Sequence, residues 1–177
     1  MQLSTAKHLK TNGFSFAEVC VAIVVCVLFG AAAFTTNQRL LIALRAQKET
    51  TAASMMLQER MEKFRSFSYS NAADKTYVLT NVVQNSTTSE APLGNLSETI
   101  TVTGYTAASG YTPASGDYNQ WVRNAAHPTG QEQHHNDNLA ANYDLIQVDV
   151  SITWTSAGGR GRTRDLSAIF GKGNIGP

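Results

Sequence analysis

The chain of 177 residues carries a net charge of +1, and 15% of its residues are charged. This length suits one domain with its own core and is too short for two domains of ordinary size. The charged fraction is below the roughly 25% of ordinary soluble domains. A near-neutral chain gives no electrostatic reason to expect binding to nucleic acid or to membrane headgroups.

An apolar segment, residues 14–34, dominates the N-terminal part of the sequence. It contains one charged residue, Glu18, and both cysteines of the chain, Cys20 and Cys26. About 20 apolar residues are enough to cross a bilayer as a helix. On a helix the two cysteines lie about 9 Å apart along the axis and point in different directions, which excludes a disulfide between them.

Three interpretations of this segment are open. The first is a secretory signal peptide that is cut after the small residues 31–33, although a carboxylate inside its apolar core argues against it. The second is an uncut signal anchor. Lys7 and Lys10 precede the span and Arg39 and Arg45 follow it, so the positive-inside rule does not decide its orientation. The third interpretation places the cut before the span.

This third interpretation depends on the residues that start the span. A basic leader of residues 1–13 ends in Gly13, the next residue is Phe14, and Glu18 would be the fifth residue of the cut chain. This pattern resembles the prepilin cleavage and N-methylation motif of the type IV pilin-like family, which includes the pseudopilins. The resemblance implies cleavage after Gly13 by a prepilin peptidase/methyltransferase and methylation of the new Phe14 amine. It also implies assembly with other pilin or pseudopilin subunits through the N-terminal helix.

Glu18 has two physical interpretations. An ionisable residue inside a membrane span costs about 2.5–3.5 kcal/mol by insertion scales and therefore needs a partner. The resemblance implies that this partner is the Phe14 amine of a neighbouring subunit, so that Glu18 acts in assembly. Alternatively, Glu18 is a helix-start residue, because the helix dipole favours acids in the first turn by about 0.3–1 kcal/mol.

The sequence predicts one long helix over residues 14–67, a range without proline. In its second half, residues 35–67, apolar side chains recur at helical spacing and indicate a stripe that packs on a sheet. The stripe consists of Ile42, Ala46, Ala53, Leu57, Met61 and Phe64. Gly30, inside the span, marks either local unwinding or a close-packing position.

Residues 68–177 are predicted to form a head domain on a small antiparallel sheet. The clearest strand covers residues 145–155, where apolar and polar residues alternate. A glycine-rich turn at 156–159 leads to a returning strand at 163–170. Further strands are predicted at residues 77–83, 97–103 and 118–123, and a long polar loop at about 104–143.

The predicted fold class is α+β. It resembles the pilin architecture, in which one long N-terminal helix, membrane-spanning in its first half, packs on a small antiparallel β-sheet. The strand, Gly- and Arg-containing turn and final strand near the end of the chain resemble those of pilus-modification minor pilins and of I-type minor pseudopilins of type II secretion.

The resemblance implies a minor pilin or pseudopilin, a structural subunit that primes, joins or caps a type IV pilus or a type II secretion filament. Such a subunit is a single-pass protein of the bacterial inner membrane, with its C-terminal domain outside the cytoplasm. The alternative is a single-pass membrane-anchored binding protein that uses its exposed polar loop for recognition.

The predicted loop contains a group of polar residues that could bind a metal: His127, His134, His135 and Asp137. Metal coordination needs three or four ligands that converge in a defined geometry. A loop rich in Asn and Gly provides little rigidity, so we expect a solvated loop and no bound metal.

Three arginines, Arg160, Arg162 and Arg164, alternate near the last predicted turn. They could contact phosphates, but on a near-neutral chain they favour a solvated hairpin over a nucleic-acid site. The sequence holds no nucleophile elbow, P-loop, HExxH or CxxC pattern. We therefore expect no enzyme activity, no cofactor and no nucleic-acid partner.

Replacement of Gly13 by a bulky residue is expected to block maturation, because only glycine leaves the enzyme cleft unobstructed next to the scissile bond. The test compares precursor and mature masses of wild type and Gly13→Trp in a host that carries the peptidase. Full processing of the variant would contradict the prediction that cleavage depends on Gly13. A wild-type chain that starts at Phe34, or that stays uncut, would instead support a signal peptide or an anchor.

Overall fold

The computed structural model describes residues 15–85, 93–106, 117–136 and 139–173. Contacts within the chain define two compact units, Met1–Leu41 and Ile42–Pro177. The predicted leader, with Gly13, and the following Phe14 lie outside the described residues.

Helix α1 runs without interruption from Phe16 to Arg65, which confirms the long helix predicted for residues 14–67. The predicted boundary between residues 34 and 35 falls inside this continuous helix. The helix ends in a tight turn, where the Phe67 N–H donates to the Phe64 carbonyl at 3.1 Å. The side chain of Ser68 then caps the short helix α2, Tyr69–Ala73.

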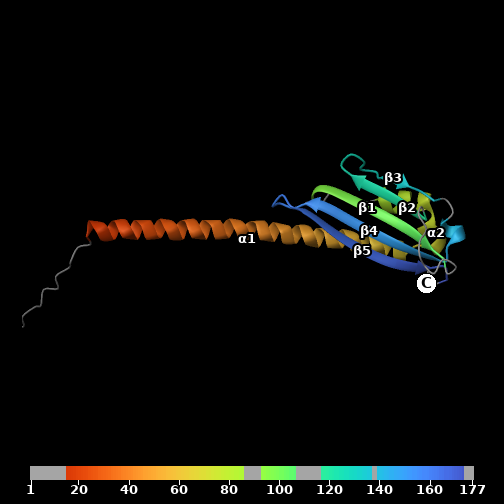
Figure 1. The fold of residues 1–177 in the computed structure, drawn as a ribbon, viewed down its shortest axis with the longest axis horizontal. Helices are drawn as coiled ribbons and strands as arrows, with labels where there is room; N and C mark the ends of the chain where they lie inside the picture. The colour runs from red at the N-terminus through yellow and green to blue at the C-terminus, as the bar shows by residue number, and fades with distance from the viewer. Residues whose placement is uncertain (1–14, 86–92, 107–116, 137–138, 174–177) are drawn as a thin grey trace, which may run out of the picture. The chain divides into compact units, whose positions relative to one another are not determined.

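Among the described residues, five strands form one antiparallel sheet in the order β3-β2-β1-β4-β5. Their bounds are β1 Gly94–Tyr105, β2 Tyr118–Asn124, β3 Gln131–His134, β4 Leu145–Thr155 and β5 Gly161–Gly171. Strand β4 matches the predicted residues 145–155, and the turn before β5 contains Gly159 with a φ of 73°. The helices of the Ile42–Pro177 unit lie on one side of the sheet (Figure 1). The α+β, pilin-like architecture predicted from the sequence is confirmed.

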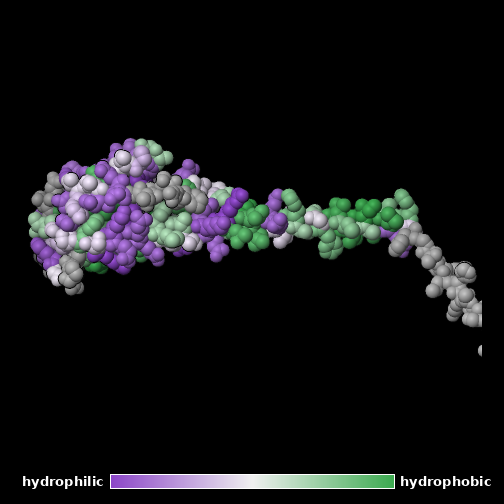
Figure 2. All heavy atoms as spheres, turned by 180° about the vertical axis from the view of Figure 1, so that it is seen from behind, coloured by the Kyte–Doolittle hydropathy of each residue, from purple (hydrophilic) through white to green (hydrophobic). Residues whose placement is uncertain are grey.

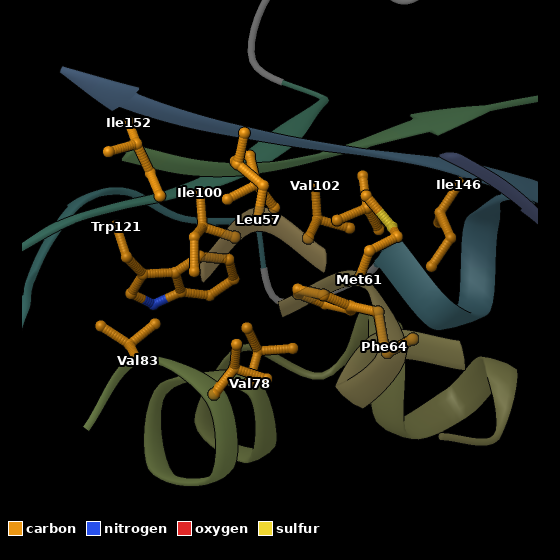
Figure 3. Close-up of a cluster of buried hydrophobic side chains, with 14 of the residues drawn as sticks. Leu57, Met61, Phe64, Val78, Val83, Ile100, Val102, Trp121, Ile146 and Ile152 are labelled. Atoms are coloured by element: carbon orange, nitrogen blue, oxygen red, sulfur yellow. The ribbon is translucent and has the colours of Figure 1, made fainter. Parts of the chain in front are cut away.

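The core lies between this sheet face and the C-terminal half of α1. Leu57, Met61 and Phe64 of the helix point toward strand residues that include Ile100 and Trp121 (Figure 3). The predicted stripe is confirmed from Ala53 to Phe64, where its members are buried. Its beginning is not covered: Ile42 is 48% exposed, and Ala46 is only half-buried.

The strand predicted at residues 77–83 is wrong. These residues form the end of helix α3, Lys75–Val78, and the π-helical turn η1, Leu79–Val83. The β-branched residues favoured a strand, but Val78 and Val82 are both buried and stand one helical turn apart. Asp74 caps the helix, because its side chain accepts a hydrogen bond from the Tyr77 N–H at 2.7 Å.

The range 104–143, predicted mainly as a polar loop, contains regular structure. The predicted strand at 118–123 is present as β2, and the structure adds β3 and helix α4, Leu139–Asn142. The turn before β3 lies close to η1. A Cβ added at Gly130 in this turn would lie 2.2 Å from Val83 Cγ1, which is too close for a side chain. Gly130 also has a φ of 80°, so a residue with a side chain would be strained there.

A buried ion-pair cluster joins α1 to two strands. Glu98 of β1 is 1% exposed and lies between Arg60 of α1 and Arg123 of β2, which are 1% and 6% exposed. Its Oε1 accepts a hydrogen bond from Arg60 Nε at 2.6 Å, and its Oε2 accepts one from Arg123 Nε at 2.9 Å. Arg60 also contacts Glu59, which is partly exposed, at 3.4 Å. Each oxygen of the Glu98 carboxylate therefore binds one guanidinium, and neither arginine is left without a counter-charge.

We expect Glu98→Gln to lower the free energy of unfolding by about 3–5 kcal/mol, because two guanidinium groups would remain buried without their shared carboxylate. Urea unfolding of the detergent-solubilised chain measures this change. Glu62→Gln is the matched control, since Glu62 is 71% exposed in its pair with Arg65 and should change stability by at most about 1 kcal/mol. Equal effects of the two substitutions would contradict the role of the cluster.

Tyr69 ties α2 to the segment after α4. Its hydroxyl donates a hydrogen bond to the Tyr143 carbonyl at 2.6 Å. Burial and, second, the negative charge of Asp144 raise the pKa of Tyr69 to about 12. The fold thus favours the neutral hydroxyl, so this group contributes stability below its unfolded pKa of about 10 and loses the contribution as the pH rises toward 12.

Tyr69→Phe should lower stability by about 1 kcal/mol at pH 8 and should lose less further stability than wild type at pH 11. Some alkaline loss remains, because the pKa of Tyr143 is also raised to about 12, mainly by its hydrogen bond with Asp117. Urea unfolding at the two pH values checks the prediction. Tyr77→Phe is the control, since no hydrogen bond of its hydroxyl is found within the described residues. The same pH dependence in wild type and Tyr69→Phe would refute the assignment.

Candidate assembly and membrane surface

The start of α1 is closed by a reciprocal pair of hydrogen bonds between Ser15 and Glu18. The Ser15 N–H donates to Glu18 Oε2 at 2.9 Å, and the Glu18 N–H donates to Ser15 Oγ at 3.3 Å. This is a capping box, in which two backbone N–H groups that lack helical partners are satisfied. The structure therefore shows Glu18 as a helix-start residue. The sequence signal for this cap is the Ser-x-x-Glu spacing of residues 15–18.

Only one oxygen of the Glu18 carboxylate takes part in this cap. Within the part of the chain that the structure describes, Glu18 Oε1 accepts no hydrogen bond. Glu18 is exposed on the surface of the helix. The cap thus fixes the position of the carboxylate while one oxygen stays open to a partner from outside the chain.

The first part of α1 exposes its apolar side chains on all sides. Phe16 is 85% exposed and Phe29 is 73% exposed. None of the most apolar part of α1 is buried in the chain. By length and composition the helix can cross a membrane. Figure 2 shows this apolar surface in green, in contrast to the largely hydrophilic face of the Ile42–Pro177 unit.

Two hydroxyl groups of this stretch are satisfied within the helix itself. The hydroxyls of Thr35 and Thr36 both donate to the Ala32 carbonyl at 2.9 Å. Such a bond lets a hydroxyl lie in an apolar surface without an unpaired donor. The helix continues through Gly30, where an added Cβ would meet nothing within 4 Å in this chain. Cys20 and Cys26 are free and exposed.

The structure places only part of the motif predicted from the sequence. Glu18 lies in the first turn of α1, whereas the processing residues Gly13 and Phe14 lie outside the described residues. Comparison of the chain with protein families, with curated proteins and with solved structures finds no match. Cleavage, methylation and assembly therefore rest on the sequence motif and on the physical properties of α1.

The histidines of the possible metal site make separate local contacts. His134 Nδ1 lies 2.7 Å from the Tyr118 carbonyl, and its ring stacks on the Tyr118 ring at 4.0 Å. His135 Nδ1 lies 2.8 Å from Glu132 Oε1. His127 lies in the exposed turn after β2. Within the described residues, no three His, Cys, Asp or Glu side chains cluster as metal ligands, and Asp137 lies outside those residues.

The three arginines near the last hairpin are exposed. Arg162 and Arg164 on β5 pair directly with Trp154 and Ile152 on β4. Paired residues of antiparallel strands share a sheet face, and Trp154 and Ile152 are buried on the helix-covered face. Both arginines therefore lie on that same face, at the edge strand, where the fold does not cover them.

Proposed function

We propose that this chain is a minor pilin or pseudopilin, a structural subunit that primes, joins or caps a filament of a type IV pilus or a type II secretion system. The observation that carries the proposal is the coincidence of the Gly13, Phe14 and Glu18 pattern with a long, apolar and uncovered helix. Apolar surface of this extent must be covered by lipid or by other proteins in the working state. The pilin-like architecture of helix and sheet supports the same function.

Cleavage after Gly13 would act as the switch for assembly. It removes the charged leader and creates an α-amino group on Phe14, which the prepilin peptidase/methyltransferase then methylates. The ammonium of one subunit binds the Glu18 carboxylate of its neighbour, through the oxygen that the cap leaves open. In an apolar layer this pair offsets the cost of both charges, whereas the uncut precursor has no amine to offer.

The same proposal gives the chain its place in the cell. The apolar part of α1 anchors the subunit in the bacterial inner membrane as a single pass, with the sheet-bearing unit outside the cytoplasm. Other pilin or pseudopilin subunits then replace lipid around the helix when the subunit enters the filament. The role is structural, without catalysis, a cofactor or a nucleic-acid partner.

Glu18→Ala is expected to leave cleavage and membrane insertion intact while reducing incorporation into filaments. The reason is that a neighbour's ammonium loses its counter-charge, and stranding one partner of a buried pair costs about 3–5 kcal/mol. Glu18→Gln should be intermediate at best, because it keeps a hydrogen bond and loses the charge. The measurement is the amount of protein in sheared filaments, or crosslinked to filament partners, relative to the membrane pool.

Ser15→Ala is the matched control for the helix cap. It removes the Ser15 Oγ acceptor and keeps the Glu18 charge and the Ser15 N–H. Incorporation should therefore stay close to that of wild type. Unchanged incorporation of Glu18→Ala would contradict the pairing of Glu18 with the ammonium of a neighbouring subunit. An equally strong defect in Ser15→Ala would instead explain Glu18 by its role at the start of the helix.

A further inference from the structure

Strand β5 has one neighbouring strand and one open edge. Among the described residues it pairs only with β4, along its whole length of 11 residues. In an antiparallel pair, every second residue of an edge strand turns its backbone N–H and C=O away from the neighbour. Within the described part of the chain, no other segment bonds to these outward groups. Such an edge can accept one more strand from another molecule.

Two cations stand at alternate positions of this edge. Arg162 and Arg164 lie on the same face of β5, about 7 Å apart along the strand. Both are exposed, and neither side chain forms a hydrogen bond or an ion pair within the described residues. Side chains that lie directly opposite each other on neighbouring strands are in contact. An added strand with acidic residues opposite both arginines would therefore form two ion pairs.

The next positions of the edge are apolar. Leu166 and Ala168 follow the arginines on the same face and are only half-buried, although they pack against the core. Ile169, on the other face, is 68% exposed. An added strand with apolar residues opposite these three would cover apolar surface that the fold leaves partly open. The edge thus has a charged part and an apolar part in a fixed order.

Asp165 restricts the charge of the partner further. It is exposed on the face of β5 opposite to the arginines, where its Oδ1 accepts a hydrogen bond from Ser151 Oγ at 2.8 Å. An acidic residue directly opposite Asp165 would be repelled. A nucleic acid carries a negative charge at every phosphate and would meet this carboxylate as well as the arginines. The pattern therefore favours a peptide segment whose acids stand at two alternate positions only.

We propose that the edge of β5 binds an extended segment of another protein as an added antiparallel strand. Read from its N-terminal end, the bound segment has apolar residues first and two acidic residues at alternate positions last. None of the described strands of this chain carries two acidic residues at alternate positions, so the segment comes from a different protein. This contact goes beyond the proposed helix-mediated assembly and does not depend on it.

A synthetic peptide tests the proposal on the full chain in non-ionic detergent micelles. The fluorescein-labelled peptide Val-Ile-Thr-Val-Lys-Glu-Thr-Glu places its residues, in order, opposite Ile169 back to Arg162. Fluorescence anisotropy measures its Kd. A control peptide with Lys in place of both Glu should bind about tenfold more weakly, because two ion pairs become like-charge contacts. A second control, methylated on the N–H groups that face β5, should also bind about tenfold more weakly, since it cannot donate to the edge.

The double variant Arg162→Glu/Arg164→Glu should reverse the preference and bind the Lys peptide more tightly. Arg45→Glu/Lys48→Glu is the matched control, because it makes the same change of charge at exposed side chains of α1 and should keep the wild-type preference. Equal binding of the Glu and Lys peptides, an unaltered preference in the β5 variant, or undiminished binding of the methylated peptide would overturn the proposal. So would tighter binding of a short DNA duplex than of the Glu peptide.

Discussion

The position of α1 on the sheet depends on one carboxylate that is shared by two guanidinium groups. Glu98 binds Arg60 of the helix through one oxygen and Arg123 of the neighbouring strand through the other. Apolar contacts alone tolerate sliding, because they are not directional. A shift of α1 by one turn would leave buried charges without partners, which costs more than the displaced apolar contacts could recover. The cluster thus selects one register for Leu57, Met61 and their neighbours.

One helix therefore serves two environments with different chemistry. Its C-terminal half buries a stripe of side chains in its own chain, whereas its N-terminal half leaves Phe16, Phe29 and their neighbours uncovered. The hydroxyls of Thr35 and Thr36 in this uncovered part donate to a carbonyl of the helix itself. The Glu18 carboxylate keeps one oxygen open, and this oxygen lies where a subunit of the proposed filament would meet its neighbour.

Local patterns predicted the parts of the fold that follow from periodicity. The alternation in residues 145–155 gave β4 its correct bounds, and the absence of proline gave the length of α1. The prediction of a strand at residues 77–83 was wrong because it relied on β-branched residues, which suit a strand. The Asp74 cap and the burial of the valines favour a helix instead. The burial of Glu49 and Glu98 was not predictable, because their partners lie far along the chain and are set only by tertiary packing.

Strand β5 ends the sheet and leaves a long row of backbone groups on its outer edge. Edges of this kind add strands from other molecules unless charge or shape prevents it. Arg162 and Arg164 lie on this strand. Both are exposed, on the same face of the sheet as the core. A strand of a second molecule that paired with this edge would place its own side chains beside these two cations. In the proposed filament, the exposed charge on β5 would oppose the fusion of neighbouring sheets into a continuous β-structure.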